Sequence, residues 1–362
     1  MQEDIFYMNK CIELAKKGWG RTNPNPLVGC VIVKNGTIIS KGYHKGIGLA
    51  HAEVDAFSNA KEDVSGGTLY VNLEPCSHFG RTPPCTDKII EKKIARVVIG
   101  MLDPNPKVSG RGVQKLMRSG IDVKVGILEE RSKLLNEIFI KYITQNKPFI
   151  ILKTAMTIDG KIASATGSSK WITAEKSRTY VHKQRDRVSA IMVGVNTLIV
   201  DDPSLNVRLK KGNNPYKIIV DTNGKIPLNS KIFLDPKSKI IVATTNQMTC
   251  EKENQLKQKG ATVLKTSIIN GRVMLEELLE KLHQMEIDSV FLEGGGTINA
   301  SFLERKLVDK IMFFIAPKIL GGKNAITPVE GEGISNVSDA LNIENIKYQK
   351  IGSDFLIEGY VR

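Results

Sequence analysis

Apolar residues in the first 145 positions alternate between helical and strand spacing. Residues 3–17 place apolar side chains at intervals of three and four, which predicts an amphipathic helix. Two apolar runs joined by Asn35-Gly36 predict a β-hairpin over 28–33 and 37–40. Further strands are predicted at 68–73, 96–100 and 122–125, and further helices at 51–60, 86–93, 113–119 and 129–145. This alternation predicts a three-layer α/β unit.

A second series of elements follows Pro148, which cannot continue the preceding helix. We therefore place a domain boundary here and expect domains at 1–145 and 146–362. Strands are predicted at 149–154, 190–195, 217–220, 240–243, 289–293 and 310–316, and helices at 174–184, 251–259, 274–284 and 298–304. The second domain is thus also expected to be α/β.

Composition excludes several classes of protein. No apolar run approaches the roughly 20 residues of a membrane-spanning helix, and the first residues lack the apolar core of an export signal. Five cysteines are few and odd in number, which argues against a disulfide scaffold. We expect a cytoplasmic protein without a membrane partner.

The formal net charge of +14 favours anionic partners, which are nucleic acid, anionic lipid or phosphorylated metabolites. The basic residues are dispersed, and aromatic residues make up only 6% of the chain. Proteins that bind single-stranded nucleic acid stack its bases on aromatic side chains. This composition therefore argues against a single-stranded nucleic-acid partner, although a lysine-rich proteome would produce the same surplus of positive charge.

His51, Glu53, Cys76 and Cys85 form the strongest chemical pattern. One imidazole and two thiolates are a three-ligand zinc set that leaves the fourth position open to water. Glu53 is then free to carry a proton between the water and a leaving amine, the pattern of zinc deaminases. A core histidine with two unrelated buried cysteines is the alternative, and the order of the residues across strand–helix units argues against it.

The spacing between the two cysteines narrows the deaminase class. Common nucleoside and nucleic-acid deaminases have two residues between them, whereas eight separate Cys76 from Cys85 here. This longer segment brings His78 and Arg81 beside the metal, where they could hold an anionic substrate. His78 is also consistent with an ordinary loop residue.

The second domain carries weaker signals. Glu293-Gly-Gly-Gly-Thr297 opens a helix after an apolar strand, which suits a phosphate group but also an ordinary tight turn. Lys153 on an apolar strand is either a surface residue or a pocket cation. Taken alone, Arg185 and Arg208 are typical of surface charges, and Trp171 of a core residue.

Several segments together resemble the bifunctional riboflavin-biosynthesis deaminase/reductase family over nearly the whole chain. The segments that carry the resemblance in the first domain are Arg21-Thr-Asn-Pro-Asn-Pro-Leu-Val-Gly29, Gly42-Tyr-His44, His51-Ala-Glu-Val54, Glu74-Pro-Cys-Ser-His-Phe-Gly-Arg-Thr-Pro-Pro-Cys85 and Asp103-Pro-Asn-Pro106. Those in the second domain are Lys153-Thr-Ala-Met-Thr-Ile-Asp-Gly-Lys161, Gly194, Thr197, Asp201-Asp-Pro203 and Glu293-Gly-Gly-Gly-Thr297.

For the first domain, the resemblance implies a cytidine-deaminase-like fold and removal of the 2-amino group of 2,5-diamino-6-ribosylamino-4(3H)-pyrimidinone 5′-phosphate. It implies that His51, Cys76 and Cys85 bind one zinc ion and that Glu53 shuttles the proton. The substrate contacts that it implies are Asn25, His44, His78 and Arg81. Family members often have lysine at the position of Arg81, so here a planar guanidinium group replaces a compact ammonium group.

For the second domain, the resemblance implies a dihydrofolate-reductase-like fold that reduces the ribosyl group to ribityl with NADPH. Lys153 and Asp201 match the family's catalytic pair. The implied cofactor contacts are Ala155, Trp171, Thr197, Asp201, Gly295, Gly296, Thr297, Ile298, Asn299, Ala300 and Ser301. The implied substrate contacts are Ser169, Arg185, Leu205, Arg208 and Glu293. We also expect a homo-oligomer.

Two other functions compete with this one. A zinc-dependent nucleic-acid or nucleoside deaminase with a fused binding domain is permitted by the charge, but the cysteine spacing argues against it. A zinc-stabilised binding module without catalysis would have no use for the non-ligand carboxylate of Glu53. Replacing Glu53 with glutamine would spare zinc in either case and abolish ammonia release only in an enzyme.

Overall fold

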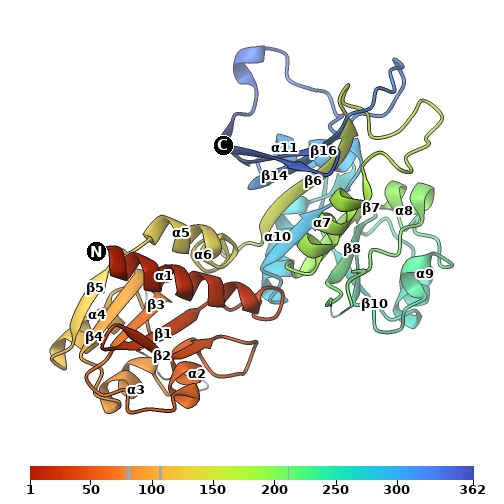
Figure 1. The fold of residues 1–362 in the computed structure, drawn as a ribbon. Coiled ribbons are helices and arrows are strands. Elements are labelled where there is room, and N and C mark those ends of the chain that lie inside the picture. Colours follow the sequence, from red (N-terminus) through yellow and green to blue (C-terminus); the bar gives the residue numbers. More distant parts are fainter. Residues whose placement is uncertain (78, 80–82, 106–107, 211) are drawn as a thin grey trace. The chain divides into compact units, whose positions relative to one another are not determined.

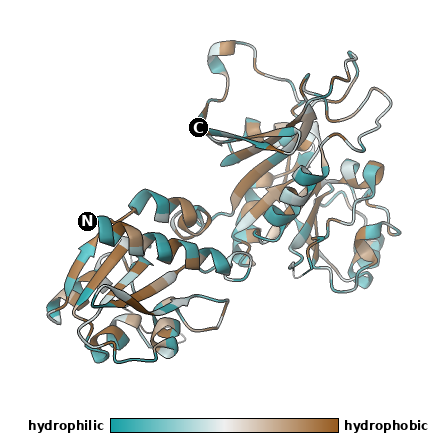
Figure 2. Cartoon of the chain, viewed as in Figure 1, coloured by the Kyte–Doolittle hydropathy of each residue, from teal (hydrophilic) through white to brown (hydrophobic). Residues whose placement is uncertain are grey.

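The computed structural model describes the whole chain except residues 78, 80–82, 106–107 and 211. It forms two compact units, Met1–Asn146 and Lys147–Arg362 (Figure 1). The sequence placed the boundary one residue earlier. In both units the sheet strands are largely hydrophobic, whereas hydrophilic residues gather on the helices (Figure 2).

The first unit is built on a five-stranded mixed sheet in the order β2-β1-β3-β4-β5. Its strands are β1 (Gly29–Lys34), β2 (Thr37–Tyr43), β3 (Thr68–Leu73), β4 (Arg96–Met101) and β5 (Asp122–Val125). Strand β1 runs antiparallel to both β2 and β3, whereas β3, β4 and β5 are parallel. Each of these strands was predicted from its apolar run.

Two apolar clusters, one on each face of this sheet, make the unit three-layered. Val31 and Val33 pack with α1 on one face, and Cys30 and Ile32 pack with α2 and α3 on the other. Period-two alternation along β1 produces this division. The helices are α1 (Gln2–Ala15), the 3₁₀ turn η1 (Lys16–Gly18), α2 (Ala52–Asn59), α3 (Cys85–Glu91), α4 (Arg111–Arg118), α5 (Glu129–Leu135) and α6 (Glu137–Gln145).

The single helix predicted over 129–145 is wrong, because it breaks at Asn136. The Asn136 side chain accepts a hydrogen bond from the Leu27 backbone N–H at 2.8 Å and donates one to the Leu27 carbonyl at 3.1 Å. Asn136 also has non-helical backbone angles, φ −106° and ψ 20°. Its partner lies far away in the sequence, so the apolar spacing alone could not show the break.

The second unit contains a nine-stranded sheet in the order β10-β9-β8-β7-β13-β6-β14-β16-β15. The seven strands from β10 to β14 are parallel, and β16 and β15 add an antiparallel edge. The strands of this sheet are β6 (Phe149–Thr157), β7 (Ala190–Gly194), β8 (Tyr216–Val220), β9 (Ile240–Thr244), β10 (Ala261–Lys265), β13 (Ser289–Leu292), β14 (Lys310–Ala316), β15 (Ile343–Ile351) and β16 (Asp354–Val361). A separate small hairpin pairs β11 (Ile268–Ile269) with β12 (Arg272–Val273).

The helices of the second unit are α7 (Glu175–Arg185), α8 (Val195–Asp201), α9 (Cys250–Gln258), α10 (Leu275–Gln284) and α11 (Gly296–Glu304), with 3₁₀ turns η2 (Lys231–Phe233) and η3 (Val337–Asp339). In this parallel sheet β13 separates β6 from β7, so the strand order reverses there. Ligands of open α/β sheets bind at the carboxyl ends of the strands beside such a reversal. Within the described part of the chain, no helix has both the length and the apolar character needed to cross a membrane.

Candidate active sites

Three elements of the first unit bring the predicted zinc ligands together. His51 directly precedes α2, Cys76 follows β3, and Cys85 is the first residue of α3. The His51 Nδ1 atom lies 3.2 Å from the Cys85 Sγ and 3.5 Å from the Cys76 Sγ. All three donor atoms lie within 4.8 Å of one another. Tetrahedral zinc with ordinary bond lengths places its nitrogen and sulfur ligands about 3.6 Å apart, so this donor set fits the ion.

The two thiols differ in acidity because they share one proton. A hydrogen bond from the Cys85 thiol lowers the pKa of Cys76, against the effect of burial, and the His51 imidazole contributes. The same pairing, together with burial, raises the pKa of Cys85. Zinc binding requires both groups as thiolates, so metal loading releases a proton from this pair.

Glu53 is the second residue of α2 and is only 3% exposed. Burial raises its pKa to about 7, and the nearby Cys76 thiolate adds to the shift. A carboxyl group with a pKa near neutrality can both accept and deliver a proton at physiological pH. The arrangement therefore supports acid–base chemistry beside the three donor atoms.

Asn25 and His44 form one wall of the same site. The His44 Nδ1 lies 3.1 Å from the Ala50 carbonyl oxygen, which can only accept, so Nδ1 carries the proton. The Nε2 atom then accepts from the Asn25 amide at 3.2 Å. Burial lowers the pKa of His44, which keeps the ring neutral, and the ring meets that of His51 edge-on with centroids 5.8 Å apart. His78 and Arg81 lie outside the described residues.

Glu74 was not singled out from the sequence, yet it holds the zinc-ligand loop to the next helix. Its buried carboxylate accepts backbone N–H bonds from Asp103, Gly110, Gly112 and Val113 at 2.9–3.2 Å. The last two amides belong to the first turn of α4, where a carboxylate also interacts favourably with the helix dipole. Cys76 stands two residues along the chain from this anchor.

A cavity of about 610 Å³ in the second unit gathers most of the predicted reductase residues. It lies at the carboxyl ends of β6, β7 and β13, as the strand order favours. The predicted residues that line it are Lys153, Ala155, Ser169, Trp171, Arg185, Thr197, Asp201, Leu205, Arg208, Glu293 and Gly295. Arg185 and Arg208 are thus pocket residues rather than surface charges, and Trp171 is 59% exposed rather than part of the core.

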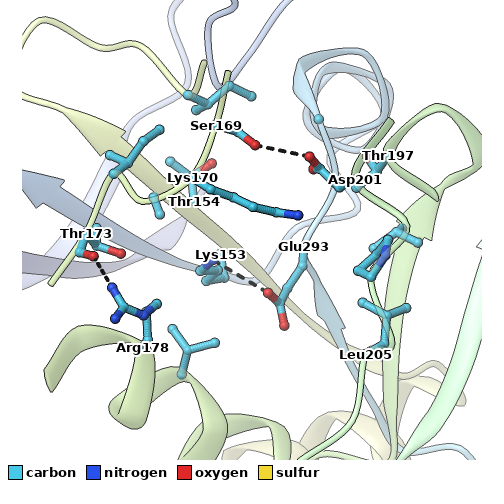
Figure 3. A pocket seen from close by; sticks show the side chains of 18 of the residues that line it. Lys153, Thr154, Ser169, Lys170, Thr173, Arg178, Thr197, Asp201, Leu205 and Glu293 are labelled. Carbon is cyan, nitrogen blue, oxygen red and sulfur yellow. Dashed lines mark hydrogen bonds and ion pairs between the residues drawn. The ribbon is translucent and has the colours of Figure 1, made fainter. Parts of the chain in front are cut away.

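One buried carboxylate organises the charges of this cavity (Figure 3). The Arg185 guanidinium donates to both oxygens of Glu293, at 2.6 and 3.0 Å, and the Lys153 ammonium lies 3.5 Å from the Oε2. Burial would raise the pKa of Glu293, but the two cations outweigh burial and lower it to about 2. Burial lowers the pKa of Lys153, which eases release of its proton.

Asp201 occupies another part of the cavity wall, at the end of α8 (Figure 3). The Ser169 hydroxyl donates to its Oδ1 at 3.0 Å. The cavity is also lined by Arg178 and His182, which the sequence did not indicate. The Arg178 guanidinium stacks over the Trp171 ring at 4.6 Å from its centroid, which holds the exposed indole in the cavity lining.

A second cavity, of about 350 Å³, shares Thr197 and Gly295 with the first. Of the predicted glycine-rich stretch, Thr297, Ile298 and Ser301 line this second cavity. The other three members, Gly296, Asn299 and Ala300, are buried and line neither cavity. The two cavities are therefore adjacent at the start of α11.

Comparison with known protein families agrees with the two sites. A family model described as "Cytidine and deoxycytidylate deaminase zinc-binding region" matches residues 1–101, and one described as "RibD C-terminal domain" matches residues 148–357. The fold and sites therefore define a cytidine-deaminase-like domain joined to a dihydrofolate-reductase-like reductase domain. The chain belongs to the RibD family of riboflavin biosynthesis proteins. It is a bifunctional deaminase and reductase of that pathway.

Individual relatives cover nearly the whole chain. The riboflavin biosynthesis protein RibD of Actinobacillus pleuropneumoniae is 47% identical over 98% of this chain and 94% of its own length. That of Aquifex aeolicus is 46% identical over 98% of this chain and 97% of its own. The crystal structure of a diaminohydroxyphosphoribosylaminopyrimidine deaminase/5-amino-6-(5-phosphoribosylamino)uracil reductase from Thermotoga maritima is 41% identical, with a TM-score of 0.87 over 100% of this chain and 99% of that one.

Proposed function

We propose that the first unit deaminates 2,5-diamino-6-ribosylamino-4(3H)-pyrimidinone 5′-phosphate to 5-amino-6-ribosylaminouracil 5′-phosphate. The second unit then reduces the ribosyl group of that product to ribityl with NADPH. The observation that carries this proposal is the presence, in one chain, of a His–Cys–Cys site with a buried Glu53 and of a separate cavity around Lys153. The name of the Thermotoga maritima relative supports the same two substrates.

In the deamination, His51, Cys76 and Cys85 hold the metal and Glu53 moves the proton. A bound zinc ion supplies a nucleophile at neutral pH by making water more acidic. Glu53 takes the proton from the attacking water and delivers it to the departing amine, a role that suits its pKa of about 7. The water oxygen replaces the 2-amino group, which leaves as ammonia.

The neutral His44 and Asn25 would orient the pyrimidine beside Glu53. Each offers a hydrogen-bonding edge, and their mutual bond fixes both side chains. His78 and Arg81 stay candidates for contacts to the substrate, Arg81 to its phosphate.

In the reduction, Lys153 and Asp201 act on the sugar. Bound NADPH supplies the hydride that adds to the C1 carbon of the opened sugar. The reduction also consumes a proton, which Lys153 would donate to the substrate. The lowered pKa of Lys153 favours that transfer. Asp201, oriented by the Ser169 hydroxyl, would accept and return a proton as the sugar ring opens.

The remaining cavity residues would bind the two ligands. Substrate contacts are assigned to Ser169, Arg185, Leu205, Arg208 and Glu293. Cofactor contacts are assigned to Ala155, Trp171, Thr197, Asp201 and the 295–301 stretch, since Thr197 and Gly295 line both cavities. The buried Gly296, Asn299 and Ala300 could contact the cofactor only through their backbone or by shaping the turn.

We further propose that the enzyme works as a cytoplasmic homo-oligomer on phosphorylated pyrimidines and not on nucleic acid. Its five cysteines, few and odd in number, support a reducing compartment.

Two substitutions test the assignment, each serving as the other's control. Glu53→Gln should lower ammonia release by at least about 100-fold while zinc content and reduction of supplied 5-amino-6-ribosylaminouracil 5′-phosphate stay normal. Lys153→Ala should abolish that reduction while ammonia release and zinc content stay normal. Loss of both activities in either variant, with the fold intact by circular dichroism, would contradict two independent sites. Ammonia release from RNA but not from the pyrimidine phosphate would favour the nucleic-acid deaminase.

A further inference from the structure

Lys217 is a buried lysine that the proposed mechanism does not use. It lies on β8 with 0% of its surface exposed. Burial lowers its pKa to about 8, so it still carries its charge at neutral pH. A buried ammonium is costly unless its donors find partners. Among the described residues no carboxylate lies within ion-pair distance of it, and its two hydrogen-bond partners are neutral groups.

Of these two groups, one is next to residues of the reductase cavity and the other is not. The Lys217 Nζ donates to the Asn206 Oδ1 at 2.5 Å and to the Ser238 Oγ at 2.7 Å. Asn206 stands in the segment 203–208, and its neighbours Leu205 and Arg208 line the reductase cavity. Ser238 precedes β9, and neither it nor Lys217 lines that cavity.

Asn206 is also joined to the charged centre of the cavity through its backbone. Its carbonyl oxygen accepts from the Arg185 Nη1 at 3.1 Å. Arg185 in turn makes the two bonds to Glu293, which faces Lys153. A continuous path of polar contacts therefore runs from Lys217 through Asn206 and Arg185 to the groups assigned to the substrate.

The conformation of the segment shows why it needs an anchor. Leu205 has a φ of 53°, in the left-handed region that a non-glycine residue adopts only at a cost. Such a conformation persists where surrounding contacts hold it. The bond from Lys217 fixes the side chain of the very next residue.

We propose that Lys217 is a positioning residue of the reductase: through Asn206 it fixes the segment 203–208 and the bond from the Arg185 Nη1 to the Asn206 carbonyl oxygen. The inference rests on the proposed assignment of the reductase cavity. Lys217 touches neither substrate nor cofactor, so it acts on the placement of Leu205 and Arg208 and therefore on substrate binding.

Variants of the two hydrogen-bond partners of Lys217 distinguish this positioning role from a purely structural role of the buried side chain. Asn206→Ala removes the contact that leads to the cavity, and Ser238→Ala removes the contact that leads away from it. Each substitution leaves the ammonium with one partner. Asn206→Asp keeps an acceptor oxygen for Lys217 and is the conservative rescue.

The experiment is steady-state reduction of 5-amino-6-ribosylaminouracil 5′-phosphate by the full chain, with ammonia release measured in parallel. Asn206→Ala and Lys217→Met should raise the KM for this substrate about tenfold, as expected for loss of a bond to a charged group, with kcat within about threefold. Ser238→Ala and Asn206→Asp should keep KM within about twofold of the wild type. Ammonia release should not change in any variant.

Two results would overturn the inference: a wild-type KM in Asn206→Ala, or an equal rise of KM in Ser238→Ala. If Lys217→Met does not fold, the comparison of Asn206→Ala with Asn206→Asp still tests the inference. A wild-type chain that releases ammonia but reduces nothing would instead refute the proposed function, so the two failures are distinguishable.

Discussion

At the residue scale, the reductase cavity depends on one buried carboxylate that neutralises two buried cations. Glu293 meets Arg185 in a two-bond pair and Lys153 at 3.5 Å. Such a group stabilises the fold only while it is ionised. Its folded pKa of about 2 lies below the ordinary value of 4.5, so its contribution is complete above pH 4.5 and is lost as the pH falls toward 2.

This linkage predicts a measurable pH dependence. Between pH 5.5 and 3.5 the second unit should lose about 1 kcal/mol of unfolding free energy through Glu293 alone, a loss that Glu293→Gln should not show. The variant should also be less stable at pH 7 by about 3 kcal/mol, since Arg185 and Lys153 lose their counter-charge. Urea unfolding in a W19F background, where Trp171 is the remaining tryptophan, reports on this unit. Equal pH slopes in the two proteins would refute the assignment.

The sequence identified residues whose chemistry demands a particular type and missed those defined by distant partners. Zinc needs imidazole and thiolate, so His51, Cys76 and Cys85 could be found from their order, and the structure brings them together. Glu74 acts on amides some 30 to 40 positions away, and Lys217 acts through Asn206. No local pattern distinguishes either from an ordinary charged residue. His78 and Arg81 stay predictions.

At the scale of elements, the placement of α2 on the sheet sets the zinc site. This helix begins after His51 and carries Glu53, and it lies against Gly42 of β2. A Cβ atom at Gly42 would overlap the backbone of Ala52 and Ala56. Glycine is therefore needed here for close approach of strand and helix.

Gly42→Ala should accordingly push α2 away from the sheet. We expect the first unit to lose about 1–3 kcal/mol of stability, and zinc affinity to fall by about tenfold because the His51 ligand is displaced. Thermal unfolding and competition with a chelator measure the two effects. Lys41→Ala, which trims the exposed neighbouring residue, is the control and should change neither. A Gly42→Ala variant with wild-type zinc affinity would show that α2 tolerates the shift.

Elements with strong apolar periodicity were predicted well, and those governed by tertiary context were not. Strands β3, β5 and β14 have the predicted bounds. Helix α8 was missed because Val195-Asn-Thr-Leu-Ile-Val200 is rich in β-branched residues, which are typical of strands. Strand β15 was missed because most of its side chains are exposed, so it lacks the apolar alternation that marks a half-buried strand.

At the scale of the whole molecule, each compact unit contains its own complete set of candidate groups. The described zinc donors and Glu53 all lie within Met1–Asn146, and the Lys153 cavity lies within Lys147–Arg362. The pairing of these two units was predictable because the motifs of both occur in one chain. The reductase assignment depended on the family resemblance, since its residues carry no metal-like signature.

Because the sites are separate, removal of zinc should affect one activity only. Chelation should stop ammonia release from the diaminopyrimidine phosphate, since the donor set then has no ion to hold. Reduction of supplied deaminated substrate should continue at the wild-type rate, and added zinc should restore the first activity. Loss of the reductase activity on chelation would show that the two units depend on one another.

The most direct test of the account follows ammonia and NADPH absorbance together, starting from 2,5-diamino-6-ribosylamino-4(3H)-pyrimidinone 5′-phosphate. We expect ammonia release without NADPH, and then oxidation of one NADPH for each ammonia already released. Ammonia release without any NADPH oxidation would support the deaminase assignment and contradict the reductase assignment. Oxidation of NADPH that precedes ammonia release, or no ammonia from zinc-loaded, folded protein, would contradict the proposed order and substrate.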